Sequence, residues 1–151
     1  MKSLIEIDHA QPKDIPWIAT AQVAMAAETE GISLNPDQVM QGVRYIFDHP
    51  ERGFYILAKA DQQPIGCLLI LKEWSDWRNG DVWWVHSVYV DPAHRQQGVF
   101  KKMFDYIEQL ARNSQIRGLR LYVDKTNINA QRVYEKLGMN KDHYDLFEKM
   151  F

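Results

Sequence analysis

The sequence predicts a mixed α/β domain, because strand-type and helix-type segments alternate along its length. The alternation is clearest between residues 81 and 138, where a β-branched and aromatic run is followed by a helical repeat, a second strand-type run and a second helical repeat. A chain of 151 residues with 46% hydrophobic residues is large enough for one substantial core. We therefore expect a single domain over residues 1–151.

Five elements are expected before residue 73, each bounded by turn-forming or capping residues. They are a strand at residues 4–7, helices at 15–27 and 35–48, and strands at 53–60 and 64–72 joined by a hairpin at 61–63. Gly31 is expected to end the first helix. Asn35 can cap the second helix, with Pro36 at its first helical position.

The second half of the chain predicts a strand, helix, strand and helix, followed by a last strand. The run from Asp81 to Val90 is typical of a strand, and it stops at Asp91-Pro92 because proline cannot continue a ladder. The elements expected after it are a helix from about residue 98, a strand at 118–123, a helix at 127–137 and a strand at 143–151.

A basic glycine turn separates the run 81–90 from the following helix: Arg95-Gln96-Gln97-Gly98-Val99-Phe100-Lys101-Lys102. The first amides of a helix have no intrahelical acceptor, and the helix dipole adds positive charge, so this end can bind an anion. Gly98 lets backbone N–H groups approach a bulky oxyanion, and the basic side chains add charge. Taken alone, the turn fits the ordinary start of a helix as well as a site for a phosphate-bearing cofactor.

A second motif follows the next strand: Asn127-Ile128-Asn129-Ala130-Gln131-Arg132-Val133-Tyr134-Glu135-Lys136-Leu137-Gly138-Met139. Together with the glycine turn, it resembles the GCN5-related N-acetyltransferase (GNAT) superfamily, which uses acetyl-coenzyme A (acetyl-CoA). The resemblance implies a mixed, mostly antiparallel central sheet with helices on both faces, and direct acetyl transfer within a ternary complex. It assigns cofactor binding to Val88, Tyr89, Val90, Arg95, Gln96, Gln97, Gly98, Val99, Phe100, Lys101, Asn127 and Ala130. Phe100 departs from the family pattern, which has Gly or Ala there, and its ring could change how the pyrophosphate binds.

Acetyl transfer to an alkyl amine requires two proton transfers, because the amine is almost fully protonated at pH 7 and the leaving thiolate must gain a proton. His86 is the candidate base. Strict alternation places it on the same face as Trp84, Val88 and Val90, and several members of the superfamily carry a base at this strand position. The alternatives are a half-buried structural histidine and deprotonation through water.

Tyr134 is the candidate acid. The resemblance places this tyrosine at the cofactor sulfur, whereas its spacing with Ala130, Val133 and Leu137 also fits a simple core stripe. Asn127 begins the same helix, where it can cap the helix, contact the pantetheine arm, or do both.

Carboxylates near tryptophans form the candidate acceptor site. Glu28 and Glu30 close the first helix, and Trp74 and Asp76 lie in an acidic, Trp-rich segment before the glycine turn. Carboxylates with aromatic faces suit a cationic amine, so we expect a small primary amine such as a polyamine, an amino acid or an amine drug. The alternative is that these carboxylates are solvated loop charges and the tryptophans fill the core or a homodimer contact.

The composition argues against several partners. Lys and Arg number 18 and Asp and Glu number 20, and the net charge of -2 gives no support for a nucleic-acid or acidic-membrane partner. The N-terminus lacks a signal-peptide core and no apolar run could span a bilayer, so we expect a cytoplasmic protein. No metal is expected, and Cys67 is expected to be a small buried hydrophobe. Two other functions stay open: a non-catalytic coenzyme A-binding regulatory module and a peptide or protein N-acetyltransferase.

Overall fold

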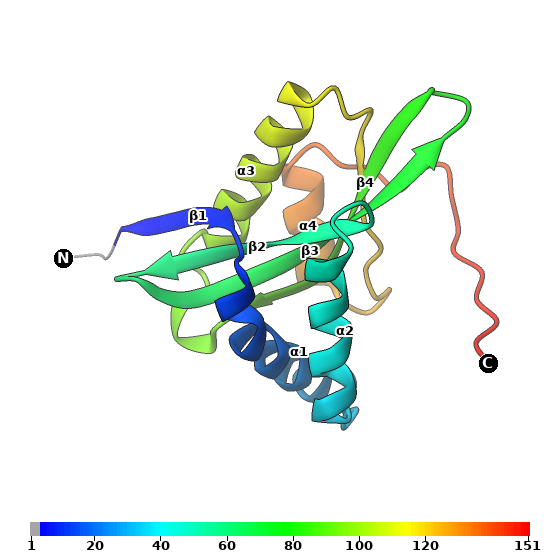
Figure 1. Ribbon diagram of the computed structural model, residues 1–151. Helices are drawn as coiled ribbons and strands as arrows, with labels where there is room; N and C mark the ends of the chain where they lie inside the picture. The colour runs from blue at the N-terminus through cyan, green and yellow to red at the C-terminus, as the bar shows by residue number, and fades with distance from the viewer. Residues whose placement is uncertain (1–3) are drawn as a thin grey trace. The chain divides into compact units, whose positions relative to one another are not determined.

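The computed structural model describes residues 4–151 and contains two compact units (Figure 1). The first unit ends at Leu121 and the second runs from Tyr122 to Phe151. The elements of the first unit are β1 (Ile5–His9), η1 (Pro12–Asp14), α1 (Ile15–Glu30), α2 (Pro36–Asp48), β2 (Gly53–Ala60), β3 (Gln63–Ser75), β4 (Gly80–Val90), η2 (Pro92–His94), α3 (Val99–Asn113) and β5 (Leu119–Arg120). The second unit contains α4 (Ile128–Lys136). Within residues 4–151, no helix combines the length and the apolar character needed to cross a membrane.

The strands form one sheet in the order β1-β2-β3-β4-β5. Neighbouring strands are antiparallel except β4 and β5, which are parallel and are connected through α3. This confirms the mixed, mostly antiparallel sheet. Within residues 4–121, β5 pairs with β4 only through Trp83 and Trp84, so no strand of this unit lies beside the outer edge of β4 at residues 88–90.

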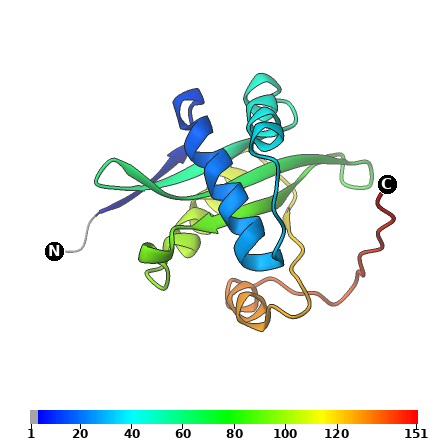
Figure 2. The ribbon, with the colours of Figure 1, turned by 90° about the horizontal axis from the view of Figure 1, so that it is seen from below.

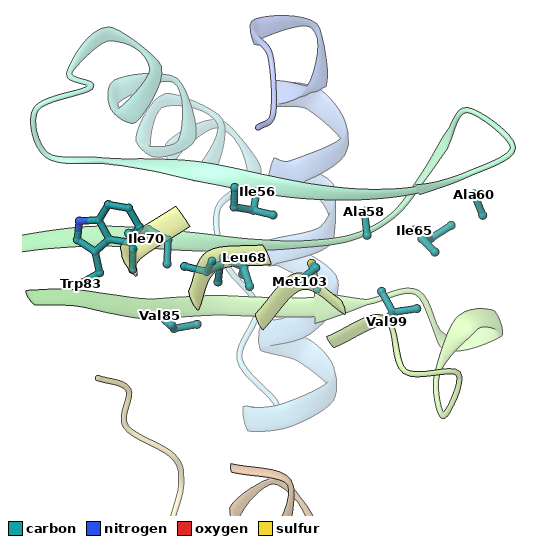
Figure 3. Packing of buried hydrophobic residues seen from close by; sticks show 12 residues of the cluster. Ile56, Ala58, Ala60, Ile65, Leu68, Ile70, Trp83, Val85, Val99 and Met103 are labelled. Atoms are coloured by element: carbon teal, nitrogen blue, oxygen red, sulfur yellow. The ribbon is translucent and has the colours of Figure 1, made fainter. Parts of the chain in front are cut away.

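Helices cover both faces of the sheet, as expected. α3 lies on one face, and α1 lies with α2 beside it on the other (Figures 1 and 2). On the first face, Val99 and Met103 of α3 pack against apolar side chains of β2, β3 and β4 (Figure 3). On the second face, Ile18 of α1 and Val43 of α2 pack against β2 and β3, where Cys67 is fully buried. The side chains of β4 therefore divide between an α3 face and an α1/α2 face.

A β-bulge in β4 changes which side chains share a face. Tyr89 pairs with Cys67 and His86 pairs with Leu69, so two residues of β4 lie opposite the single residue Leu68. Ser87, one of these two, has a left-handed backbone with φ of 56°. The extra residue reverses the alternation beyond it, so the expectation that His86 shares a face with Val88 and Val90 is wrong. Those two valines pack on the α3 side, whereas the partners of His86 and Tyr89 on β3 pack on the α1/α2 side.

The capping residues of the first two helices are where the sequence predicts them. Gly31 ends α1 in a left-handed conformation, with φ of 64°, and its N–H donates to the carbonyl oxygens of the last turn. The side chain of Asn35 accepts hydrogen bonds from the amides of Asp37 and Gln38 at the start of α2. α1 continues three residues past the expected end at residue 27, because no helix-breaking residue precedes Gly31.

Two expected strands differ in the structure. The strand expected at 118–123 is reduced to Leu119 and Arg120, because β5 pairs with β4 over two residues only. The last strand, expected at 143–151, is absent: residues 137–151 contain neither helix nor strand. A strand needs a neighbour to accept its backbone hydrogen bonds, and residues 122–151 contain no other strand to supply one. Alternating composition alone could not provide that partner.

Candidate active site

The glycine turn is a helix N-terminus with open space around it. Gly98 is the N-cap of the 15-residue helix α3 and has a left-handed backbone, with φ of 76°. The first intrahelical hydrogen bond runs from the Lys102 N–H to the Gly98 carbonyl oxygen at 3.0 Å. The amides of residues 99–101 therefore have no acceptor within the helix. A Cβ placed on Gly98 would meet no heavy atom within 4 Å. This geometry fits a phosphate group approaching the backbone closely.

Two of the basic side chains of the turn, Arg95 and Lys101, already form ion pairs within the first unit. The Arg95 guanidinium donates from Nε to the Val90 carbonyl oxygen at 2.9 Å and from Nη2 to Glu28 Oε2 at 2.7 Å. Lys101 Nζ donates to Asp105 Oδ2 at 2.7 Å on the next turn of α3. Anion binding at this turn would therefore depend first on the backbone amides and the helix dipole.

The ring of Phe100 is partly buried. The ring packs against the core cluster on the α3 face, and its centroid lies 6.0 Å from that of Phe104. The departure from the family pattern is thus accommodated by the core under α3.

The outer edge of β4 could hydrogen-bond to the amide-containing arm of a phosphate-bearing cofactor. Residues 88–90 lead directly into η2 and the glycine turn, and within residues 4–121 no strand pairs with this edge. An extended ligand with amide groups can hydrogen-bond to such an edge as an added strand would. Residues 88–90 and the glycine turn are therefore the parts of the first unit that could hold such a ligand.

His86 is half-buried on the α1/α2 face of β4, immediately before the bulge. Its ring stacks on that of Trp84, with centroids 6.0 Å apart and planes inclined by 19°. Burial lowers the pKa of His86 below its ordinary value of 6.5. The imidazole is therefore neutral at pH 7, the state in which it can accept a proton.

Gln22 is a buried polar residue that the sequence reasoning missed. It is 7% exposed, and its side-chain N–H donates to the Ser87 carbonyl oxygen at 3.1 Å and lies 3.6 Å from Cys67 Sγ. This hydrogen bond satisfies the backbone of the bulge beside His86. The available signal was periodicity, since Gln22 falls four residues after Ile18 on the otherwise apolar stripe of α1.

In the second unit, Asn127 is the N-cap of α4, and its Oδ1 accepts a hydrogen bond from the Ala130 amide at 3.1 Å. The capping role is thus present, and the role in holding pantetheine stays a prediction. Tyr134 lies in the last turn of α4, and burial raises its pKa above 10.0. The phenol is therefore protonated at neutral pH, as a general acid must be.

The four candidate acceptor residues lie in two separate places. Glu28 and Glu30 are in the last turn of α1, where Glu28 pairs with Arg95. Trp74 lies at the end of β3 and Asp76 in the turn that joins it to β4, and both views place this hairpin away from the end of α1 (Figures 1 and 2). The structure does not bring the two pairs together.

Cys67 is not a candidate for a catalytic thiolate. Its side chain is fully buried, and burial raises the pKa of the thiol to about 12. It is therefore the small buried hydrophobe that the sequence predicts, and no thiolate forms at neutral pH.

Comparisons with known proteins agree with this arrangement. The model of the Acetyltransferase (GNAT) family matches residues 19–139. A possible acetyltransferase from Clostridium difficile 630 is a solved structure that is 38% identical, with a TM-score of 0.91 over 98% of both chains. AAC(6')-Iy, solved with the bisubstrate analog CoA-S-monomethyl-acetylneamine, is 20% identical, with a TM-score of 0.79 over 99% of both chains. At that identity the likeness concerns the fold alone.

One curated relative matches part of the chain. It is streptothricin acetyltransferase from Escherichia coli, 26% identical over 87 residues, which are 58% of this chain and 47% of the relative. The chain thus spans about half the length of this curated relative.

Proposed function

We propose that this chain, which belongs to the acetyltransferase (GNAT) family, transfers acetyl from acetyl-CoA to a primary amine of a small molecule in one direct step. N-acetyltransferase activity and the use of acetyl-CoA follow from family membership. The observation that carries the proposal is the open helix start at Gly98, which follows the outer edge of β4 at residues 88–90. The neutral, half-buried His86 lies on β4 just before that edge.

The cofactor would be held by backbone more than by side chains. We expect the pyrophosphate over the amides at the start of α3 and the pantetheine arm along residues 88–90 of β4. When bound, acetyl-CoA supplies an acetyl thioester as the electrophile. The protein's part is to orient that thioester and to move two protons.

His86 is the proposed base and Tyr134 the proposed acid. The acceptor amine must lose a proton before it can attack a carbonyl carbon, and a neutral imidazole can accept one, directly or through one water. The departing sulfur needs a proton, and the phenol of Tyr134, protonated because of its raised pKa, can donate one. Loss of either group should slow turnover without preventing cofactor binding.

The small-molecule acceptor is supported by the chemistry of the chain and by one curated relative. Streptothricin acetyltransferase, which is 26% identical over 87 residues, is named for a small-molecule substrate. In this chain, carboxylates stand at the end of α1 and aromatic residues on the same sheet face, a combination that attracts cations. A peptide acceptor is the second candidate, and the following assay distinguishes it from a small amine.

The test is release of the coenzyme A thiol over a panel of acceptors. The panel should hold aliphatic diamines, amino acids, an aminoglycoside and a peptide with a free N-terminus, each with a reaction lacking acceptor. We expect acceptor-dependent release with at least one small amine and none with the peptide. Binding of coenzyme A without thiol release for any amine would contradict the proposal and favour the regulatory module.

A further inference from the structure

A cavity of about 240 Å³ lies between α1 and the end of β4, within the first unit. It is lined by Trp17, Thr20, Ala21, Ala24, Tyr89 and Asp91. The four α1 residues follow at i, i+3, i+4 and i+7, so they form one side of the helix. The two alanines leave room that larger side chains would fill.

Two aromatic rings form the walls of this cavity. The rings of Trp17 and Tyr89 meet edge to face, with centroids 6.1 Å apart. The Tyr89 ring already attracts one cation, because the Arg95 guanidinium carbon lies 5.9 Å from its centroid. An organic cation in the cavity would find the same kind of π-face on Trp17, which is the more favourable ring for this interaction.

The charges around the cavity favour a positive ligand. Asp91 lines it and holds η2, accepting from the Ala93 amide at 3.3 Å and lying 3.3 Å from His94 Nδ1. Glu28 is also close to the Tyr89 phenol, whose pKa is raised chiefly by burial and then by Glu28 and Asp91, with Arg95 opposing them. Two carboxylates and one guanidinium leave one formal negative charge beside the cavity. An ammonium ion is attracted here and an anion is not.

The cavity lies on the same sheet face as the proposed base. Tyr89 and His86 are successive side chains on the α1/α2 face, because the bulge at Ser87 shifts the alternation between them. Their partners on β3, Cys67 and Leu69, are two residues apart, which corresponds to roughly 7 Å along a strand. A short aliphatic chain is long enough for that separation if it passes the side chain of Gln22, which lies against Cys67 and the Ser87 carbonyl oxygen.

We propose that this cavity is a subsite of the acceptor site, which holds one ammonium group of a short aliphatic diamine between Trp17, Tyr89 and Asp91 while the other nitrogen is presented toward His86. This inference rests on the proposed function. The volume supports a small ligand, since pockets for drug-sized molecules span roughly 300–1,000 Å³. The sequence predicts a small primary amine in general as the acceptor. The proposed subsite favours a diamine over a monoamine of the same length.

The test compares putrescine with butylamine as acceptors for the wild type and for Asp91→Asn. Asparagine keeps the capping oxygen of η2 and removes the charge, and thermal unfolding checks that the variant is folded. We expect Asp91→Asn to raise KM for putrescine about tenfold with kcat within twofold, and to leave butylamine kinetics unchanged. Asp48→Asn, which removes a carboxylate at the end of α2, is the matched control and should change neither acceptor.

A binding measurement with tetramethylammonium, which cannot be acetylated, separates the cation site from catalysis. Titration should change the tryptophan fluorescence of the wild type and of Trp77→Phe, whose indole is exposed, but not that of Trp17→Phe. Equal turnover of putrescine and butylamine, or a fluorescence response that survives in Trp17→Phe, overturns the subsite and leaves the proposed function standing. A weaker response in Asp76→Asn but not in Asp91→Asn would move the cation site to the β3–β4 turn. Absence of turnover with every amine overturns the proposed function and, with it, the acceptor role of the cavity.

Discussion

Exchanging Gly98 for asparagine or aspartate isolates the electrostatic part of cofactor binding. Both side chains have the same shape, and both tolerate the left-handed backbone that Gly98 adopts at φ of 76° better than other residues do. A new Cβ meets nothing within 4 Å, so each variant should lose only about 1 kcal/mol of folding stability, mainly from backbone strain. Any difference between the two in affinity for coenzyme A therefore reports charge.

The size of that difference follows from Coulomb's law. A carboxylate about 4 Å from a phosphate charge costs about 1 kcal/mol in bulk water and about 4 kcal/mol at an effective dielectric constant of 20. Gly98 is exposed, so the lower part of this range applies. We expect Gly98→Asp to bind coenzyme A about 5- to 30-fold more weakly than Gly98→Asn, a penalty of about 1–2 kcal/mol.

Calorimetric titration of both variants at low salt and at about 1 M salt measures this effect. Screening should shrink the ratio at high salt, because the Debye length falls to about 3 Å. Equal affinities for the two variants at low salt would refute the placement of the pyrophosphate over this turn.

Three further outcomes are expected. Phe100→Ala should lower the free energy of unfolding by about 2–3 kcal/mol, less than for a fully buried ring, and leave coenzyme A affinity unchanged; a large gain in affinity would show that the ring obstructs the site. His86 should give the rate an acidic limb below pH 6.5 at saturating cofactor. The free energy of unfolding should also fall as the pH drops below 6.5, because a lowered pKa means that the folded state binds fewer protons than the unfolded state. His86→Gln should remove both effects, and an unchanged pH profile would exclude His86 as the base. Tyr134→Phe should lower turnover by roughly 10²-fold or more with cofactor affinity retained, whereas full turnover combined with earlier melting would identify Tyr134 as a packing residue only.

The fold was predictable where local chemistry decides it. Gly31 predicts the end of one helix, because a left-handed C-cap favours glycine. Asn35 predicts the start of the next, because an N-cap side chain must accept hydrogen bonds from backbone amides. Period-2 and period-3.6 patterns located β2, β3, β4 and α3, whereas β5 is shorter than the expected strand at 118–123. The glycine turn was visible for the same reason, since Gly98 takes a conformation that few other residues adopt.

Features set by tertiary contacts were not predictable. The bulge at Ser87 places a non-glycine residue in the left-handed region, and its support comes from Gln22, 65 positions earlier in the chain. Strict alternation therefore assigned the wrong neighbours to His86. The Arg95–Glu28 ion pair joins residues 67 positions apart, and no periodicity reveals that a predicted phosphate-binding side chain and a predicted amine-binding side chain contact each other.

Mass spectrometry of the protein and the products tests most directly the claim of one-step transfer to an amine. With acetyl-CoA alone, the intact protein should keep its mass, in keeping with a buried Cys67 whose thiol pKa is about 12. After addition of putrescine, acetylated amine and free coenzyme A should appear in equal amounts. A protein that gains an acetyl group before the amine is added and loses it afterwards, or coenzyme A released without any acetylated amine, would contradict the account.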